Sequence, residues 1–272
     1  MSNVRILLLF VLAIAVSPLA GQETASHRVV LPVVGNAAGS KGTFFKSAVT
    51  LLNTNYRNGT SAPANQRVRV DFYPQGGSAD LTAPVFFTFG AFIQHWSNFL
   101  ADFYAVPRTG LGAVVFTAVD ADGNEQTDAR LFAVSRIYTA QASTAGCPTP
   151  GGEVSQSLES VPFDDLASFT ERGWIHGLRQ DARFRTNVGV VNHSDSTQAF
   201  TVTLYPFTGG DPSSYEVTVP ARGMIHSAIP AGDYGPSLLL SVQAKVPGFF
   251  FSAYGSTVDN ATGDGWTFRA TY

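Results

Sequence analysis

The most regular feature of the chain is a series of short segments in which apolar and polar residues alternate. Residues 68–72 read Val-Arg-Val-Asp-Phe, and residues 200–204 read Phe-Thr-Val-Thr-Leu. A period of two places alternate side chains on opposite faces of a β-strand. The segments are rich in Val, Phe, Thr and Tyr and are separated by turn-forming residues. The pattern therefore predicts an all-β protein made of antiparallel sheets that each bury one face.

The alternating segments occur as two similar sets. Residues 45–53 match residues 184–192 in an aromatic residue, a base, apolar alternation and a final Asn, and residues 70–74 match residues 202–206 in a Tyr-Pro ending. Two more pairs of apolar runs follow in the same order, 111–116 with 234–240 and 131–135 with 249–253. The first copy carries an insertion within residues 55–66, as surface loops tolerate. We therefore expect two tandem β-sandwich domains of immunoglobulin-like proportions.

The repeat also predicts where the two domains begin and end. The first sandwich is expected over residues 27–140 and the second over residues 173–272. Residues 141–172 start with a small, polar, Pro- and Gly-bearing stretch, which is typical of a linker. Acidic residues near the start of the segment 162–169 favour one short helix there.

Equivalent residues of the two copies should occupy equivalent places. We expect Phe45 to match Phe184, Tyr73 to match Tyr205, and Asn53 and Asn192 to end equivalent strands. In each copy the apolar residues two positions apart should face one core, because a slip of one residue would expose them all. These residues are Val49 and Leu51 in the first copy, and Val188 and Val190 in the second.

The N-terminal residues 1–21 resemble a secretory signal peptide. One basic residue, Arg5, precedes an apolar run over residues 6–16, and small residues lead to Gly21. This run is too short to cross a bilayer, which takes about 20 helical residues. Gln22 stands where a lipoprotein needs a cysteine. We expect a secreted, periplasmic or cell-surface protein without a membrane anchor after cleavage.

Charge and cysteine content exclude several classes of function. The formal net charge is −3, and Lys and Arg are scattered singly, so nucleic acid is not an expected partner. Charged residues make up only 14% of the chain, which fits sheets with short turns in an exported protein. Cys147 is the only cysteine, so neither an intramolecular disulfide nor a thiolate zinc site can form.

Three segments of the chain carry a family resemblance. Residues 184–192, 202–205 and 258–264 resemble a family of tandem secreted bacterial β-sandwich repeat domains of unknown function. The likeness extends over both copies, from about His27 to Phe268. It implies a binding or architectural module in an extracellular or surface protein, with no assigned catalytic residues.

The sequence contains no recognisable catalytic motif, so we expect a protein that is not an enzyme. The histidines lack the spacing that places two imidazoles on one helix face, and the Gly-x-Ser-x-Gly elbow is missing. His95 and His226 occupy comparable stretches of the two copies, each close to a serine. The alternative is a secreted hydrolase with a site at the interdomain cleft, where Asp164, Asp165, Glu171 and His176 lie near the junction.

A carboxylate-rich loop is the one candidate for metal binding. Asp120, Asp122, Asn124 and Asp128 could offer oxygen ligands to Ca²⁺. The spacing departs from the EF-hand pattern, since Gly123 holds the fourth position and not the sixth. The second copy has no carboxylates in this loop, so a hairpin turn is the favoured interpretation.

Aromatic residues suggest what the protein could bind. Trp96, Trp174 and Trp266 could stack on sugar rings, although core packing explains most aromatic residues better. The expected partner is therefore a glycan or another surface protein, contacted by a binding, adhesion or architectural module. The alternating segment 266–272 also resembles the closing strand of an outer-membrane barrel, which is a further alternative.

Overall fold

The fold is built almost entirely from β-strands, as the alternation predicts. The computed structural model describes residues 25–39, 43–54, 66–80, 84–90, 92–105, 107–140, 152–168, 170–207 and 209–272. The predicted signal peptide, Cys147 and most of the predicted insertion lie outside the described residues. Every strand pairing in the sheets is antiparallel, so the all-β, sandwich-like fold class is confirmed.

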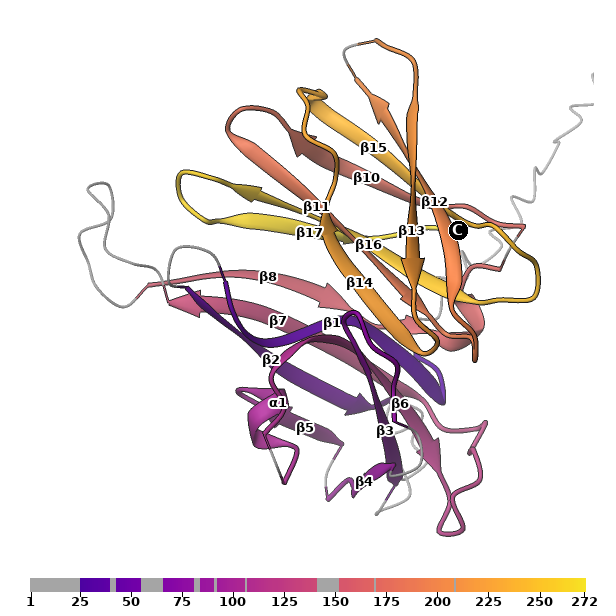
Figure 1. Cartoon of the computed structure of the whole chain (residues 1–272). Coiled ribbons are helices and arrows are strands. Elements are labelled where there is room, and N and C mark those ends of the chain that lie inside the picture. Colours follow the sequence, from indigo (N-terminus) through magenta and orange to yellow (C-terminus); the bar gives the residue numbers. More distant parts are fainter. Residues whose placement is uncertain are drawn as a thin grey trace, which may run out of the picture.

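The first copy forms two layers around one core (Figure 1). One layer has the strand order β4-β3-β6-β1 and the other the order β5-β2-β7-β8. The end of β1 pairs with the start of β2, which joins both layers into one continuous sheet. The strands are β1 (Arg28–Ala38), β2 (Phe44–Asn53), β3 (Arg67–Pro74), β4 (Val85–Thr88), β5 (Ile93–Trp96), β6 (Gly110–Val119), β7 (Leu131–Ala140) and β8 (Glu153–Glu159), with one short helix, α1 (Phe99–Asp102).

The second copy repeats this pairing strand by strand. Its layers have the orders β10-β15-β12-β13 and β14-β11-β16-β17, which reproduce the first copy when each strand is matched in chain order. The strands are β10 (Gly173–Gln180), β11 (Phe184–Asn192), β12 (Gln198–Pro206), β13 (Ser213–Val219), β14 (Gly223–Ala228), β15 (Gly235–Ala244), β16 (Phe251–Asp259) and β17 (Gly265–Arg269). The sequence repeat is therefore a repeat of topology.

Residues matched between the copies hold equivalent places in these sheets. Tyr73 and Tyr205 each precede the proline that ends its strand, and Asn53 and Asn192 are the last residues of β2 and β11. The inward-facing pairs Val49 with Leu51 and Val188 with Val190 are fully buried in the two separate cores. Period-two alternation thus correctly predicts which side of each strand is buried.

The segment between the copies differs from the predicted linker. Residues 153–159 form β8, which pairs with β7 along its whole length and is the counterpart of β17. Only Leu158 of this strand is buried, so the strand lacks the apolar alternation that reveals the others. A two-residue strand, β9 (Val161–Pro162), pairs with β1, and the expected helix is the single 3-10 turn η3 (Phe163–Asp165).

The two sandwiches pack face to face through a third apolar core. The outer face of β1, β3 and β6 covers the outer face of β11, β14 and β16 (Figure 1). Tyr73 and Met224 are fully buried there, and the amide of Gly76 donates to the Met224 carbonyl over 2.9 Å. A Cβ on Gly223 would lie 2.1 Å from the Gly77 carbonyl oxygen, so glycine at this position permits the close approach.

Candidate functional site

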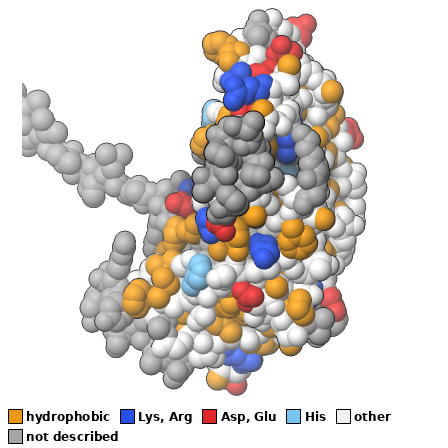
Figure 2. All heavy atoms as spheres, turned by 90° about the vertical axis from the view of Figure 1, so that its left-hand side faces the viewer, with side chains coloured by type: hydrophobic (Ala, Val, Ile, Leu, Met, Phe, Trp, Pro, Cys, Tyr) orange, Lys and Arg blue, Asp and Glu red, His pale blue; other side chains and the backbone are white. Residues whose placement is uncertain are grey.

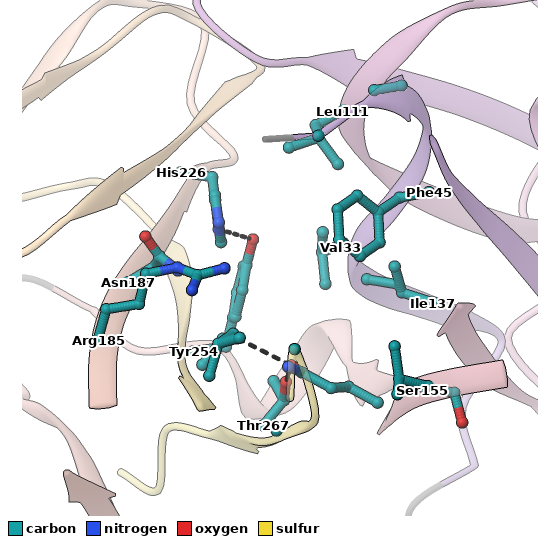
Figure 3. A pocket seen from close by; sticks show the side chains of 18 of the residues that line it. Val33, Phe45, Leu111, Ile137, Ser155, Arg185, Asn187, His226, Tyr254 and Thr267 are labelled. Carbon is teal, nitrogen blue, oxygen red and sulfur yellow. Dashed lines mark hydrogen bonds between the residues drawn. The ribbon is translucent and has the colours of Figure 1, made fainter. Parts of the chain in front are cut away.

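A cavity of about 250 Å³ lies where the two sandwiches meet. The first sandwich lines it mainly with apolar side chains, and the second contributes most of its polar ones (Figure 3). On the face shown in Figure 2, hydrophobic side chains gather around the middle of the molecule. The apolar residues that line the cavity from the first sandwich include Val33, Ala37, Phe45, Leu111, Ile137 and Val154.

The polar wall is organised around Gly189 in β11. This residue pairs with His226 of β14 on one side and with Tyr254 of β16 on the other. A Cβ on Gly189 would lie 2.0 Å from Cε1 of Tyr254, so the Tyr254 ring lies across the glycine. The Tyr254 hydroxyl thereby reaches Nδ1 of His226 at 2.9 Å, and the two rings stack. Because Gly189 has no side chain, Tyr254 of β16 can reach across β11 to His226 of β14.

Burial keeps both members of this pair uncharged. Desolvation lowers the pKa of His226 to about 4 and raises the pKa of Tyr254. At neutral pH the wall therefore presents a neutral imidazole and a neutral phenol that share one hydrogen bond. Arg185 is then the only charged side chain among the described residues that line the cavity.

Arg185 and a small amide–hydroxyl cluster complete the polar lining. Arg185 is half-buried, and its Nη1 donates to Oδ1 of Asn260 over 2.6 Å. Elsewhere in the cavity lining, Oε1 of Gln156 in β8 accepts hydrogen bonds from the hydroxyls of Ser256 and Thr267. The cluster links the last strand of the first copy to the second sandwich, which holds the two walls together.

The equivalent positions in the first copy, Thr50 and His95, lie on a face that is open to solvent. His95 pairs with Thr50 as His226 pairs with Gly189, and Thr50 Oγ1 lies 2.9 Å from His95 Nδ1. His95 is exposed, because no second sandwich covers that face. The two histidines therefore occupy equivalent positions in the strand pairing, as predicted, but His226 is covered by the other sandwich and His95 is not.

The acidic residues of the hydrolase alternative lie together, without the histidine. Asp164, Asp165 and Glu171 line a second pocket of about 300 Å³. Glu171 accepts hydrogen bonds from the amide and hydroxyl of Ser168, which lower its pKa. His176 is exposed on β10 and does not line this pocket. The structure therefore does not assemble the four residues into one constellation.

The calcium candidates form a tight turn between β6 and β7. The carboxylate of Asp120 accepts from the backbone and side-chain amides of Asn124, at 2.8 and 3.0 Å, and these bonds lower its pKa. Asp122 and Asp128 are exposed. Across the described residues, the structure has no group of three or more His, Cys, Asp or Glu side chains that could hold a metal ion. Calcium binding by this loop stays an untested alternative to the hairpin turn.

The three tryptophans have different surroundings. Trp96 packs among Phe87, Phe99 and Phe103 in the first sandwich, and Trp266 packs on Phe184 and donates its Nε1 hydrogen to Gly177. Trp174 lies on the outer face of the second sandwich, 5.5 Å from the ring of Tyr205. Arg172 donates to the Tyr205 hydroxyl beside this pair. The Trp174 and Tyr205 face is thus the best remaining place for stacking on a sugar.

Comparisons with protein-family models, with curated proteins and with solved structures found no match. The resemblance to tandem secreted bacterial β-sandwich domains therefore stays a prediction. In the described part of the chain, the one α-helix is far too short to span a membrane.

Most of the residues that line the cavity carry no signal in the sequence. His226 stands out by its match with His95, whereas Arg185, Asn187 and Tyr254 do not stand out. A glycine inside an apolar strand often marks a close approach by a neighbouring group. Gly189, between Val188 and Val190, was the available signal of this kind.

Proposed function

We propose that the protein is a secreted, non-enzymatic binding module that takes up a small molecule in the cavity between its two sandwiches. The observation that carries this proposal is the division of the cavity into an apolar and a polar wall. Small-molecule sites are typically concave, mostly apolar, and lined by a few polar groups that fix the ligand's orientation. Domain interfaces are a common place for them.

A binding role accounts for this site better than catalysis does. The imidazole of His226 is hydrogen-bonded to the phenol of Tyr254, where a nucleophile–base pair would place it beside a serine or cysteine. The hydroxyl of Ser256 donates to Gln156. Screening the mature chain against esterase, glycosidase and peptidase substrates tests the enzyme alternative, and turnover abolished by changing His176 would support it.

Filling the cavity should abolish binding of an apolar probe. Ala37 lines the cavity, so Ala37→Trp places an indole in the space that a ligand would occupy. We expect N-phenyl-1-naphthylamine, a neutral fluorescent probe, to bind the unmodified chain saturably, with the signal reduced at least tenfold in this variant. Fluorescence titration is the measurement.

The matched control for this experiment is Ala121→Trp. Ala121 is exposed at the turn after β6, whereas Leu111, near the start of β6, lines the cavity. The control variant should bind the probe as the unmodified chain does. Equal binding by Ala37→Trp and the unmodified chain would show that the cavity is not the site.

Glycan contact is a second candidate, favoured by the Trp174 and Tyr205 pair on the outer face of the second sandwich. Aromatic faces stack on the apolar side of sugar rings, and polar groups at their edges orient the hydroxyls. A glycan array tests this candidate, with Trp174→Ala as the variant that should lose any signal.

A further inference from the structure

We infer that the ligand of the interdomain cavity is a small organic anion with an apolar body, of the carboxylate class, whose charged group is bound by Arg185. This inference rests on the proposed function and adds the chemical class of the ligand. It depends on the charge balance of the cavity, on the neighbours of Arg185, and on the arrangement of the two walls.

The charge of the cavity lining is unbalanced. Arg185 brings a permanent positive charge, and no Asp or Glu is among the described residues that line the cavity. Neutral His226 and Tyr254 neither add to this charge nor offset it. A partly desolvated guanidinium without a counter-ion is unfavourable, because burial of a charge is costly unless it is paired. A bound anion would supply the missing partner.

Arg183, two residues before Arg185, differs from it by having an acidic partner. Arg183 forms an ion pair with Asp259 at 2.6 Å. Arg185 reaches the next residue of the same turn, Asn260, whose amide oxygen accepts a hydrogen bond but carries no charge. Of two neighbouring arginines, the one that lines the cavity therefore has the neutral partner. The Asn260 bond holds the guanidinium in place but brings no negative charge to balance it.

The two walls match the two ends of such a ligand. A guanidinium is planar and presents donors in a fork that fits a carboxylate. Asn187 lies on the same face of β11, two residues further on, and Figure 3 shows it beside Arg185 on the polar side of the cavity. Opposite them, Phe45, Leu111 and Ile137 offer apolar contact to the body of the ligand.

The test compares octanoate with octanol, which have the same apolar chain but differ in charge. Isothermal calorimetry on the mature chain should show octanoate binding at least tenfold more tightly than octanol. Arg185→Gln should remove this preference by weakening octanoate binding at least tenfold, with octanol binding unchanged. Ala37→Trp should abolish the binding of both.

The control for loss of one positive charge is Lys46→Gln. Lys46 is the counterpart of Arg185 in the repeat and is exposed on the first sandwich. This variant should keep the preference for octanoate. Equal affinities for both probes in the unmodified chain, or a preference that survives Arg185→Gln, would overturn the anion inference alone. Failure of both probes to bind, or unchanged binding in Ala37→Trp, would overturn the proposed function as well.

Discussion

The Gly189→Thr variant is expected to lose about 3 kcal/mol of unfolding free energy, the upper end of the usual cost of overpacking. Its new Cβ would meet the Tyr254 ring at 2.0 Å. Tyr254 is almost fully buried beneath the first sandwich, so its ring could move only into the cavity, and that shift would break its hydrogen bond to His226. The backbone of Gly189 is also held by strands on both sides. Urea-induced unfolding is the measurement.

The reciprocal change in the first copy is the control. Thr50 occupies the place of Gly189 in the repeat and is only half-buried, on a face without a covering domain. Thr50→Gly should cost no more than about 1 kcal/mol, the usual penalty for glycine within a strand. Equal and small effects of both changes would contradict the packing of Tyr254 across Gly189.

Acidification should destabilise the protein well above the range in which carboxylates titrate. Burial lowers the pKa of His226 to about 4 and that of His193 to about 3, with Arg28 and Arg222 also lowering the latter. Below about pH 6.5 these two histidines become protonated in the unfolded chain, whereas in the folded protein they stay neutral. The unfolding free energy should therefore fall by about 1.4 kcal/mol per pH unit for each histidine, down to its folded pKa.

His193 lies at the contact between the two sandwiches, so part of the expected loss of unfolding free energy arises there. Its ring lies against Tyr73 and Phe163, and its Nε2 is 3.1 Å from the Ser252 hydroxyl. Asp259, whose pKa is lowered to about 2 mainly by the Arg183 hydrogen bond, adds to the loss only below about pH 4. Glu171, whose pKa is lowered by its hydrogen bonds from Ser168, adds to the loss below about pH 5. The window between about pH 6.5 and about pH 5 therefore isolates the histidines.

Urea unfolding at several pH values within this window is the measurement. His226→Gln should reduce the slope of unfolding free energy against pH. His95→Gln, at the equivalent exposed position, should leave the slope as it is in the unmodified chain. A slope that does not change in His226→Gln would contradict the assignment of a buried, neutral imidazole.

The fold was largely predictable because most strands bury one face and expose the other. Spacing alone predicts the core residues Val49 and Leu51 in β2, and Val188 and Val190 in β11. β8 was missed for the opposite reason. It is an edge strand with a single buried side chain, Leu158, so its sequence reads as a polar linker.

The cavity was hidden from the sequence because it depends on how the two copies pack. Alternation shows which residues point away from a sandwich core, but not what covers them. Arg185 and Lys46 hold the same place in the repeat, as do His226 and His95, yet only the second copy's members lie under another domain. Met224 is fully buried, whereas Ile93, its counterpart in the first copy, is exposed, and this difference marks the covered face.

The most direct test of a binding site between the sandwiches is an NMR titration of the methyl groups with octanoate. We expect the methyl signals of Leu111 and Ile137 in the first sandwich and of Val258 in the second to shift together, with one dissociation constant. The methyl signals of Val190 and Leu240, inside the core of the second sandwich, should stay in place. Shifts confined to residues outside the cavity, or no shifts at millimolar octanoate, would contradict a binding site between the sandwiches.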